Sequence, residues 1–177
     1  MSLKDLTAEK HKAAESTAFM QAVFKGGMTE TVWADWTYQK LKFYGILEYL
    51  CARWGHMNDL SALRREEGLR NDFEKMTPDK LIITRKTTHA YLDYLRDLQD
   101  RQLLAHVYVW HMGDLYGGQM IKRVLPNIPH ESLDFTDTEL LKNTLRAKLT
   151  DDLGDEANVA FDWAIKLLKE YDDYFHN

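Results

Sequence analysis

Apolar residues recur every three to four positions along nearly the whole chain, which is the spacing of a helix face. Five stripes follow this spacing: Leu3, Leu6, Ala14 and Ala18; Trp33, Trp36, Tyr44, Leu47, Cys51 and Trp54; Leu81, Thr84, Thr88, Leu92 and Leu95; Leu141, Leu145 and Leu149; Ala160, Trp163, Ala164, Leu167, Tyr171 and Tyr174. No segment alternates at period two, and no Asn-Gly or Asp-Gly turn indicates a hairpin. The pattern predicts an all-α protein of seven or eight helices.

Polar and glycine residues between the stripes predict where these helices begin and end. Gly26 and Gly27 are expected to stop a short helix, and Thr29 to cap the next one. The segment Thr136–Glu139 has the pattern of a capping box. Gly154 is expected to act as a stop between the last two helices. Because no linker or repeat interrupts the pattern, residues 1–177 are predicted to form a single domain.

Net charge, cysteine content and the lack of long apolar runs limit the partners and the cellular location that we expect. The net charge is −5, so general attraction to nucleic acid or to an anionic membrane is not expected. A single cysteine, Cys51, provides no disulfide framework. No run approaches the roughly 18 apolar residues of a membrane span, and the first residues are polar and charged, unlike a signal peptide. We therefore expect a cytoplasmic protein.

The segment from His106 to Arg123 carries an unusual helix face. Gly113, Gly117 and Gly118 share an arc of about 140° with Asp114, although each glycine costs a helix interior about 1 kcal/mol relative to alanine. A face without side chains lets a flat molecule approach the backbone. Close helix packing would also explain the glycines, but it explains less well why a carboxylate shares their face.

Two further clusters contain residues that can bind a metal or an anion. Lys4, His11 and Glu15 project within about 40° of one another on the first helix. His11 could serve as a metal ligand with Glu15 orienting its ring, although a lone histidine is more often an ordinary core or surface residue. Lys142 and Arg146, one turn apart, could form an anion clamp or simply a solvated helix face.

These features together resemble the heme oxygenase family. The resemblance rests on Gly113–Gln119, flanked by Leu103–Tyr108 and Ile121–Arg123; on Leu3, Lys4, Thr7, His11, Ala14 and Glu15, followed by Phe19 and Met20; on Tyr44–Glu48; and on Lys142 with Arg146. The glycine–aspartate motif is the most specific part. The resemblance implies an all-α fold in which heme lies between the N-terminal, proximal helix and a glycine-kinked distal helix.

The resemblance also implies a reaction and its partners. Heme b would be both cofactor and substrate, and O2 with external electrons would cleave it at the α-meso carbon to biliverdin IXα, CO and Fe²⁺. Because no flavin or nicotinamide motif occurs, electrons would come from a partner protein, with ferredoxin favoured over cytochrome P450 reductase. A basic patch would receive ferredoxin: Lys122, Arg123, Lys142, Arg146 and Lys148. A bilin reductase is a possible downstream partner.

Roles for individual residues follow from the same resemblance. His11 would be the axial iron ligand, with Glu15 beside it. Asp114 would hold a water network that supplies protons to the oxygen chemistry, and Tyr44 would join that network. The remaining residues would contact the heme plate or its propionates: Gly113, Gly117 and Gly118 over the distal face, and Lys4, Tyr108, Lys142 and Arg146 at the propionates.

Four positions depart from the family's pattern. Trp110 and His111 stand where an arginine and a tyrosine are usual, Tyr116 replaces a serine, and Ala164 replaces an asparagine of the distal network. Trp110 is expected to point into the arc of Gly113, and these changes are expected to slow turnover. A heme carrier or sensor without efficient turnover is the alternative. A helical di-iron protein is disfavoured, because no Glu-x-x-His pair occurs.

Overall fold

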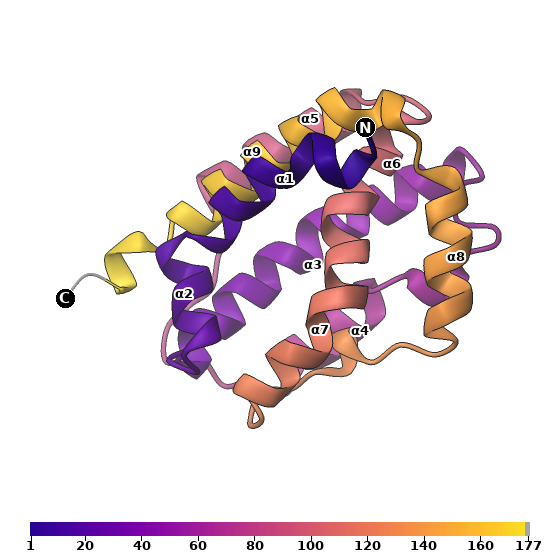
Figure 1. Ribbon diagram of the computed structural model, residues 1–177. Coiled ribbons are helices and arrows are strands. Elements are labelled where there is room, and N and C mark those ends of the chain that lie inside the picture. The colour runs from indigo at the N-terminus through magenta and orange to yellow at the C-terminus, as the bar shows by residue number, and fades with distance from the viewer. Residues whose placement is uncertain (176–177) are drawn as a thin grey trace.

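The computed structural model describes residues 1–175, and it contains helices and short turns with no strand among those residues (Figure 1). Its nine α-helices are α1 (Leu3–Glu15), α2 (Ala18–Phe24), α3 (Glu30–Arg53), α4 (Glu66–Glu74), α5 (Lys86–Asp97), α6 (Gln102–Val107), α7 (Gly113–Val124), α8 (Thr138–Lys148) and α9 (Gly154–Lys169). Short 3₁₀ turns lie at Ser61–Leu63, Glu131–Leu133, Asp151–Leu153 and Asp172–Tyr174. The predicted all-α class is confirmed.

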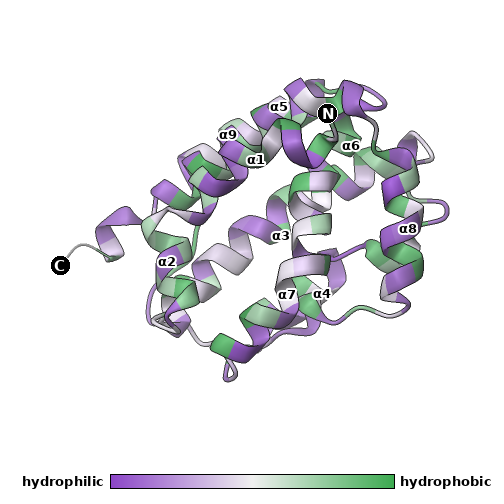
Figure 2. Cartoon of the chain, in the orientation of Figure 1, coloured by the Kyte–Doolittle hydropathy of each residue, from purple (hydrophilic) through white to green (hydrophobic). Residues whose placement is uncertain are grey.

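The long helix α3 runs through the middle of the molecule, and the other helices pack around it (Figure 1). Its buried residues include Phe43, Tyr44, Leu47 and Cys51, none of which has any exposed surface. Helix α1 lies along α9, and α9 packs on α6. Figure 2 shows hydrophilic residues interspersed along each helix, and none of the described helices is long and apolar enough to cross a bilayer.

Helices α6 and α7 form one continuous helix that is interrupted by a π turn at Tyr108–Met112. A π turn adds a residue to the helical repeat, so it changes which side chains face each neighbour and often bends the helix. Here it precedes Gly113, the first residue of α7. The sequence predicted a kink from the glycines, but the irregular hydrogen bonding lies in the five residues before them.

Two helix ends agree with the sequence prediction. The hydroxyl of Thr29 accepts a hydrogen bond from the amide of Val32 at 3.3 Å, and this caps α3. Gly26 follows α2 with a φ of +69°, a left-handed conformation that favours glycine.

Three expected helix boundaries are wrong. The Thr136–Glu139 capping box does not form, because Asp137 adopts a left-handed conformation before α8 and no side chain caps that helix. Gly154 begins α9 rather than ending a helix, and a Cβ there would lie 2.9 Å from Leu6 of α1. Leu81 lies in a loop with 87% of its surface exposed, since α5 begins only at Lys86.

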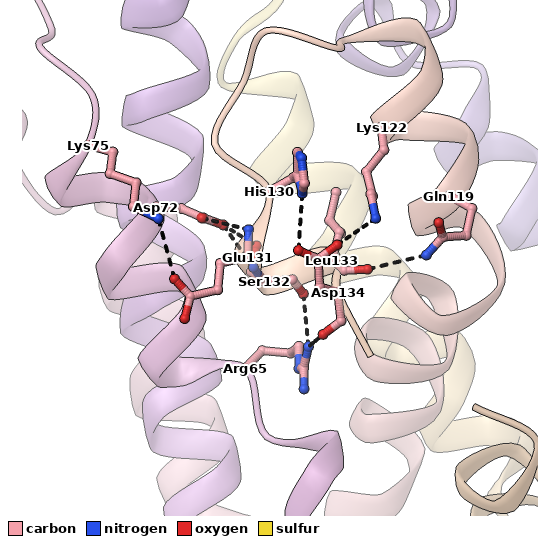
Figure 3. Close-up of polar contacts among 10 residues, drawn as sticks. All are labelled: Arg65, Asp72, Lys75, Gln119, Lys122, His130, Glu131, Ser132, Leu133 and Asp134. Carbon is pink, nitrogen blue, oxygen red and sulfur yellow. Dashed lines mark hydrogen bonds and ion pairs between the residues drawn. The ribbon is translucent and has the colours of Figure 1, made fainter. Parts of the chain in front are cut away.

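A loop between α7 and α8 is held against α4 by buried hydrogen bonds, which Figure 3 shows. The Asp72 carboxylate accepts the amide of Glu131 at 2.8 Å, the amide of Ser132 at 3.0 Å and the hydroxyl of Ser132 at 2.6 Å. Arg65 donates to the carbonyl of Asp134 at 2.7 Å. The turn at 131–133 is therefore fixed to the body of the protein by α4.

The same turn supports α7 from behind. Leu133 packs on Gly118, where an added Cβ would lie 3.3 Å from the Leu133 side chain. Gln119 donates to the carbonyl of Leu133, and Lys122 pairs with Asp134 (Figure 3). Helix α7 is thus positioned by a loop that is itself tied to α4.

Replacing Asp72 by alanine is expected to lower the free energy of unfolding by about 3 kcal/mol, because it leaves two buried donors of Ser132 and the partly buried amide of Glu131 without an acceptor. Denaturant unfolding measures this change. Asp97→Ala is the matched control: this aspartate is exposed on α5, and its loss should change stability by less than about 0.5 kcal/mol. A similar, small effect for both variants would contradict a supporting role for Asp72.

Candidate active site

A cleft of about 700 Å³ lies between α1 and the continuous helix of the π turn and α7. Helix α1 and its start contribute Ser2, Leu3, Lys4, Thr7, Ala8 and His11; the facing helix contributes Tyr108, Val109, Met112, Gly113 and Tyr116; Arg146, Leu149, Asp151 and Phe161 complete the lining. The first and middle parts of the chain thus meet at one largely apolar cavity with basic residues at its edge.

His11 presents its ring to this cleft from α1. Its side chain is 59% exposed, and its ring meets Phe161 edge-on with centroids 5.8 Å apart. The Nε2 atom lies 3.5 Å from Glu15 Oε1, a distance too long for a firm hydrogen bond. Glu15 is therefore an anionic neighbour of the His11 ring, as the spacing predicted, but it does not fix the orientation of the ring.

The opposite wall is bare at Gly113, which lines the cleft, and Gly117 follows one turn later on α7 outside the lining. A Cβ placed on Gly113 or Gly117 would meet no atom within 4 Å. Gly118 differs from the prediction, because it is buried beneath Leu133 on the packed side of α7. The predicted bare arc is therefore narrower than expected, since a step of one residue turns a helix by about 100°.

Asp114 and Tyr44, which the resemblance assigned to one network, form a direct hydrogen bond. The Tyr44 hydroxyl donates to Asp114 Oδ2 at 2.6 Å, and Tyr44 has no exposed surface. Burial and the charge of Asp114 raise the pKa of Tyr44 well above its usual range, so the hydroxyl keeps its proton. Lys40, one turn earlier on α3, holds its ammonium 5.5 Å from the centre of the Tyr44 ring.

A second buried pair supports Tyr44 from behind. His111 Nε2 lies 2.7 Å from Glu48 Oε2, and the His111 and Tyr44 rings lie 4.8 Å apart. Burial acts to raise the pKa of Glu48, but the bonds from His111 and from two backbone amides outweigh it and hold that pKa below its usual range. The sequence does not pair these two residues, which lie 63 positions apart; its only signal is that Glu48 follows Tyr44 by one turn on a buried helix face.

Trp110 does not point toward the glycines. It is buried in the core, and its indole nitrogen donates to the Tyr91 hydroxyl at 2.9 Å. That hydroxyl also lies 2.6 Å from Nδ1 of the buried His106. The π turn shifts the helical register between Trp110 and Gly113, which a regular helix would have placed together. Ala164 is buried in the same core.

The hydroxyl of Tyr108 forms a hydrogen bond across the cleft. The Tyr108 hydroxyl forms a hydrogen bond with Thr7 Oγ1 at 3.0 Å, and Thr7 Oγ1 also lies 2.9 Å from the carbonyl of Leu3. Tyr108 therefore lines the cleft and already has a hydrogen-bond partner on the facing helix.

The basic residues of the cleft edge come from α1 and α8. Lys4 and Arg146 line the cleft directly. Lys142 lies one turn before Arg146, and both cations rest over the ring of Tyr116, at 4.4 and 5.4 Å from its centre. The structure thus brings His11, Gly113, Lys4 and Arg146 together at one cleft, while Gly117 and Lys142 lie one turn away from its lining.

Comparison with known proteins identifies the family to which this chain belongs. A family model described as heme oxygenase matches residues 1–148. Heme oxygenase 1 of Synechocystis is 25% identical, over 95% of this chain and 82% of that protein. Heme oxygenase 2 of Macaca fascicularis is 26% identical, over 96% of this chain and 64% of that protein. The chain belongs to the heme oxygenase family.

Solved structures agree on the fold. The crystal structure of Synechocystis heme oxygenase-1 in complex with heme has a TM-score of 0.86 at 23% identity, over 98% of this chain and 91% of that one. The heme oxygenase of Leptospira interrogans has a TM-score of 0.83 at 24% identity, over 96% of this chain and 100% of that one. The standard reaction of the family yields biliverdin IXα, with heme as substrate and prosthetic group and O2 as co-substrate.

Proposed function

We propose that this chain binds heme in the cleft between α1 and α7, with His11 as the axial ligand, and opens it at the α-meso carbon. The observation that carries the proposal is that two facing walls of one cleft differ: the half-exposed His11 lines one side, and Gly113, with open space where a side chain would stand, lines the other. A flat apolar plate fits between such walls. When bound, heme supplies the iron that activates oxygen and the ring that is cleaved.

The edge of the cleft suits the two carboxylates of heme. Lys4 and Arg146 line it, and Lys142, on the preceding turn of α8, contacts the ring of the lining residue Tyr116. Glu15 lies within reach of the His11 ring and can orient it. Tyr108 contributes its ring to the wall, while its hydroxyl stays with Thr7.

Asp114 and Tyr44 are the proposed proton-handling pair. Tyr44 stays protonated and donates to Oδ2 of Asp114, which leaves Oδ1 free to hold a water molecule beside Gly113 and Gly117. A carboxylate held in this way delivers protons through water without itself touching the iron. His111 and Glu48 keep the Tyr44 ring in place.

Electrons are proposed to come from ferredoxin, an acidic protein, docking on basic residues near the cleft. Lys122 pairs with Asp134, and Lys148 pairs with Asp59 at 3.0 Å, so these two contribute less positive charge than the sequence suggested. Arg123 makes no ion pair with a residue in 1–175 and remains for docking, whereas Lys142 and Arg146 add positive charge there only in so far as the heme carboxylates do not neutralise it. The relatedness to a cyanobacterial heme oxygenase favours this donor.

Heme added to the protein should give a Soret band, and reduced ferredoxin with O2 should replace it with a bilin band. The rate should fall about tenfold between low and high salt, because salt screens the docking charges. Turnover driven by ascorbate is the control, since a small reductant needs no docking surface. A Soret band that persists under both donors would indicate a heme carrier instead. A ferredoxin-driven rate that does not respond to salt would contradict the docking patch.

A further inference from the structure

Tyr116 occupies an unusual position between the cleft and the basic residues of α8. It lines the cleft from α7, and 48% of its surface is exposed. The Lys142 ammonium lies 4.4 Å from the centre of its ring, and the Arg146 guanidinium lies 5.4 Å from it. Both distances fall within the range of a cation–π contact.

Apart from the Tyr116 ring, Lys142 and Arg146 make only weak contacts. Lys142 is mostly buried, at 19% exposure, yet its nearest carboxylate is that of the exposed Glu139, 3.8 Å away. Arg146 makes a long 3.4 Å bond to Asn143 and no ion pair with any residue in 1–175. The Tyr116 ring is therefore the contact that these two cations share.

A tyrosine ring holds cations differently from a carboxylate. Its face attracts positive charge without neutralising it, so Lys142 and Arg146 stay available to pair with an anion from the cleft. Since Tyr116 belongs to the same helix as Gly113 and Gly117, it ties the position of the cations to the wall that would cover a bound plate.

We propose that Tyr116 is a specificity-determining residue, which holds Lys142 and Arg146 where they bind the two carboxylates of the substrate and so fixes the rotation of the porphyrin in the cleft. The inference rests on the proposed heme site. A porphyrin has four meso carbons at right angles, so a quarter turn about the axial ligand brings another of them beneath α7. The position of the carboxylate-binding pair therefore selects the carbon that is attacked.

Equilibrium binding of ferric heme and of heme dimethyl ester tests the proposal, because only heme carries the carboxylates. Tyr116→Ala should weaken heme binding by about five- to thirtyfold and change ester binding by less than about twofold. Tyr116→Phe keeps the ring and should bind both ligands like the unmodified protein. Tyr49→Ala is the matched control, because Tyr49 is 59% exposed and stacks with Arg53 outside the cleft lining.

A double-mutant cycle and product analysis complete the test. Arg146→Ala should weaken heme binding, and adding Tyr116→Ala to it should cost clearly less than Tyr116→Ala alone. Chromatography of the bilin from Tyr116→Ala should show β or δ isomers beside the α isomer. Additive losses, or equal losses for heme and ester, would overturn the role of Tyr116.

The outcomes separate this inference from the proposed site. If Arg146→Ala and Lys142→Ala both leave heme affinity unchanged, the carboxylate anchors of the proposed function fail, and the inference fails with them. If those variants weaken binding while Tyr116→Ala does not, only the inference about Tyr116 fails.

Discussion

Asparagine in place of Asp114 is expected to leave heme affinity within about twofold of the unmodified protein, while biliverdin formation falls by about a hundredfold or more. The Asp114 carboxylate accepts the Tyr44 hydroxyl at 2.6 Å and has an oxygen left for water. Asparagine keeps that shape but loses the charge and the capacity to take up and release a proton. Heme titration and the rate of bilin formation per bound heme measure the two effects separately.

Two companion variants sharpen this test. Tyr44→Phe removes the donor but keeps the carboxylate, so it should slow turnover less than Asp114→Asn does. Asp93→Asn alters a carboxylate that is 79% exposed on α5 and should change nothing. Weakened heme binding with normal turnover per bound heme would show that Asp114 serves binding, which contradicts the assignment.

Loss of the His11 imidazole is expected to abolish turnover and to change the absorption spectrum of the ferric heme complex. His11→Ala removes the ring that lines the cleft, and added imidazole should restore both spectrum and activity by occupying the space it leaves. His89→Ala is the matched control, because His89 is an exposed histidine on α5. A ferric spectrum that is unchanged in His11→Ala would assign the ligand to another residue.

Two other candidate histidines, His106 and His111, are buried and form hydrogen bonds with carboxylates outside the cleft lining. His106 and His111 lie on the helix that faces α1, but both have no exposed surface. His106 bonds Glu156 at 2.8 Å, and His111 bonds Glu48 at 2.7 Å. Neither ring can enter the cleft without breaking a buried hydrogen bond, which would leave a carboxylate unpaired.

Periodicity predicted the fold class because burial of one helix face depends on residues three and four apart, which a sequence displays directly. It failed at Leu81, which has the spacing of the helix face that follows but lies in an exposed loop. It also failed at Trp110 and Gly118. The error at Trp110 comes from assuming a regular helix, because the π turn alters the register before Gly113, whereas Gly118 lies in a regular helix and is covered by Leu133 from a distant loop.

The site was predictable where one helix carries the signal and unpredictable where distant segments meet. Lys4 and His11 share α1, and their spacing placed both in the cleft. The Tyr44–Asp114 contact joins residues 70 positions apart, and no local pattern specifies its direct geometry. The stacking of Lys142 and Arg146 on Tyr116 likewise depends on how α7 and α8 approach each other, which side-chain spacing does not report.

The π turn makes the length of one short segment matter more than its composition. Deleting any single residue of Tyr108–Met112 would restore a regular repeat and turn everything before it by about 100° relative to α7. The Tyr108 ring would leave the cleft, and the buried His106 would turn away from Glu156. Insertions and deletions here should therefore be far less tolerated than substitutions, so that these five residues act as a spacer that sets the phase between two halves of one helix.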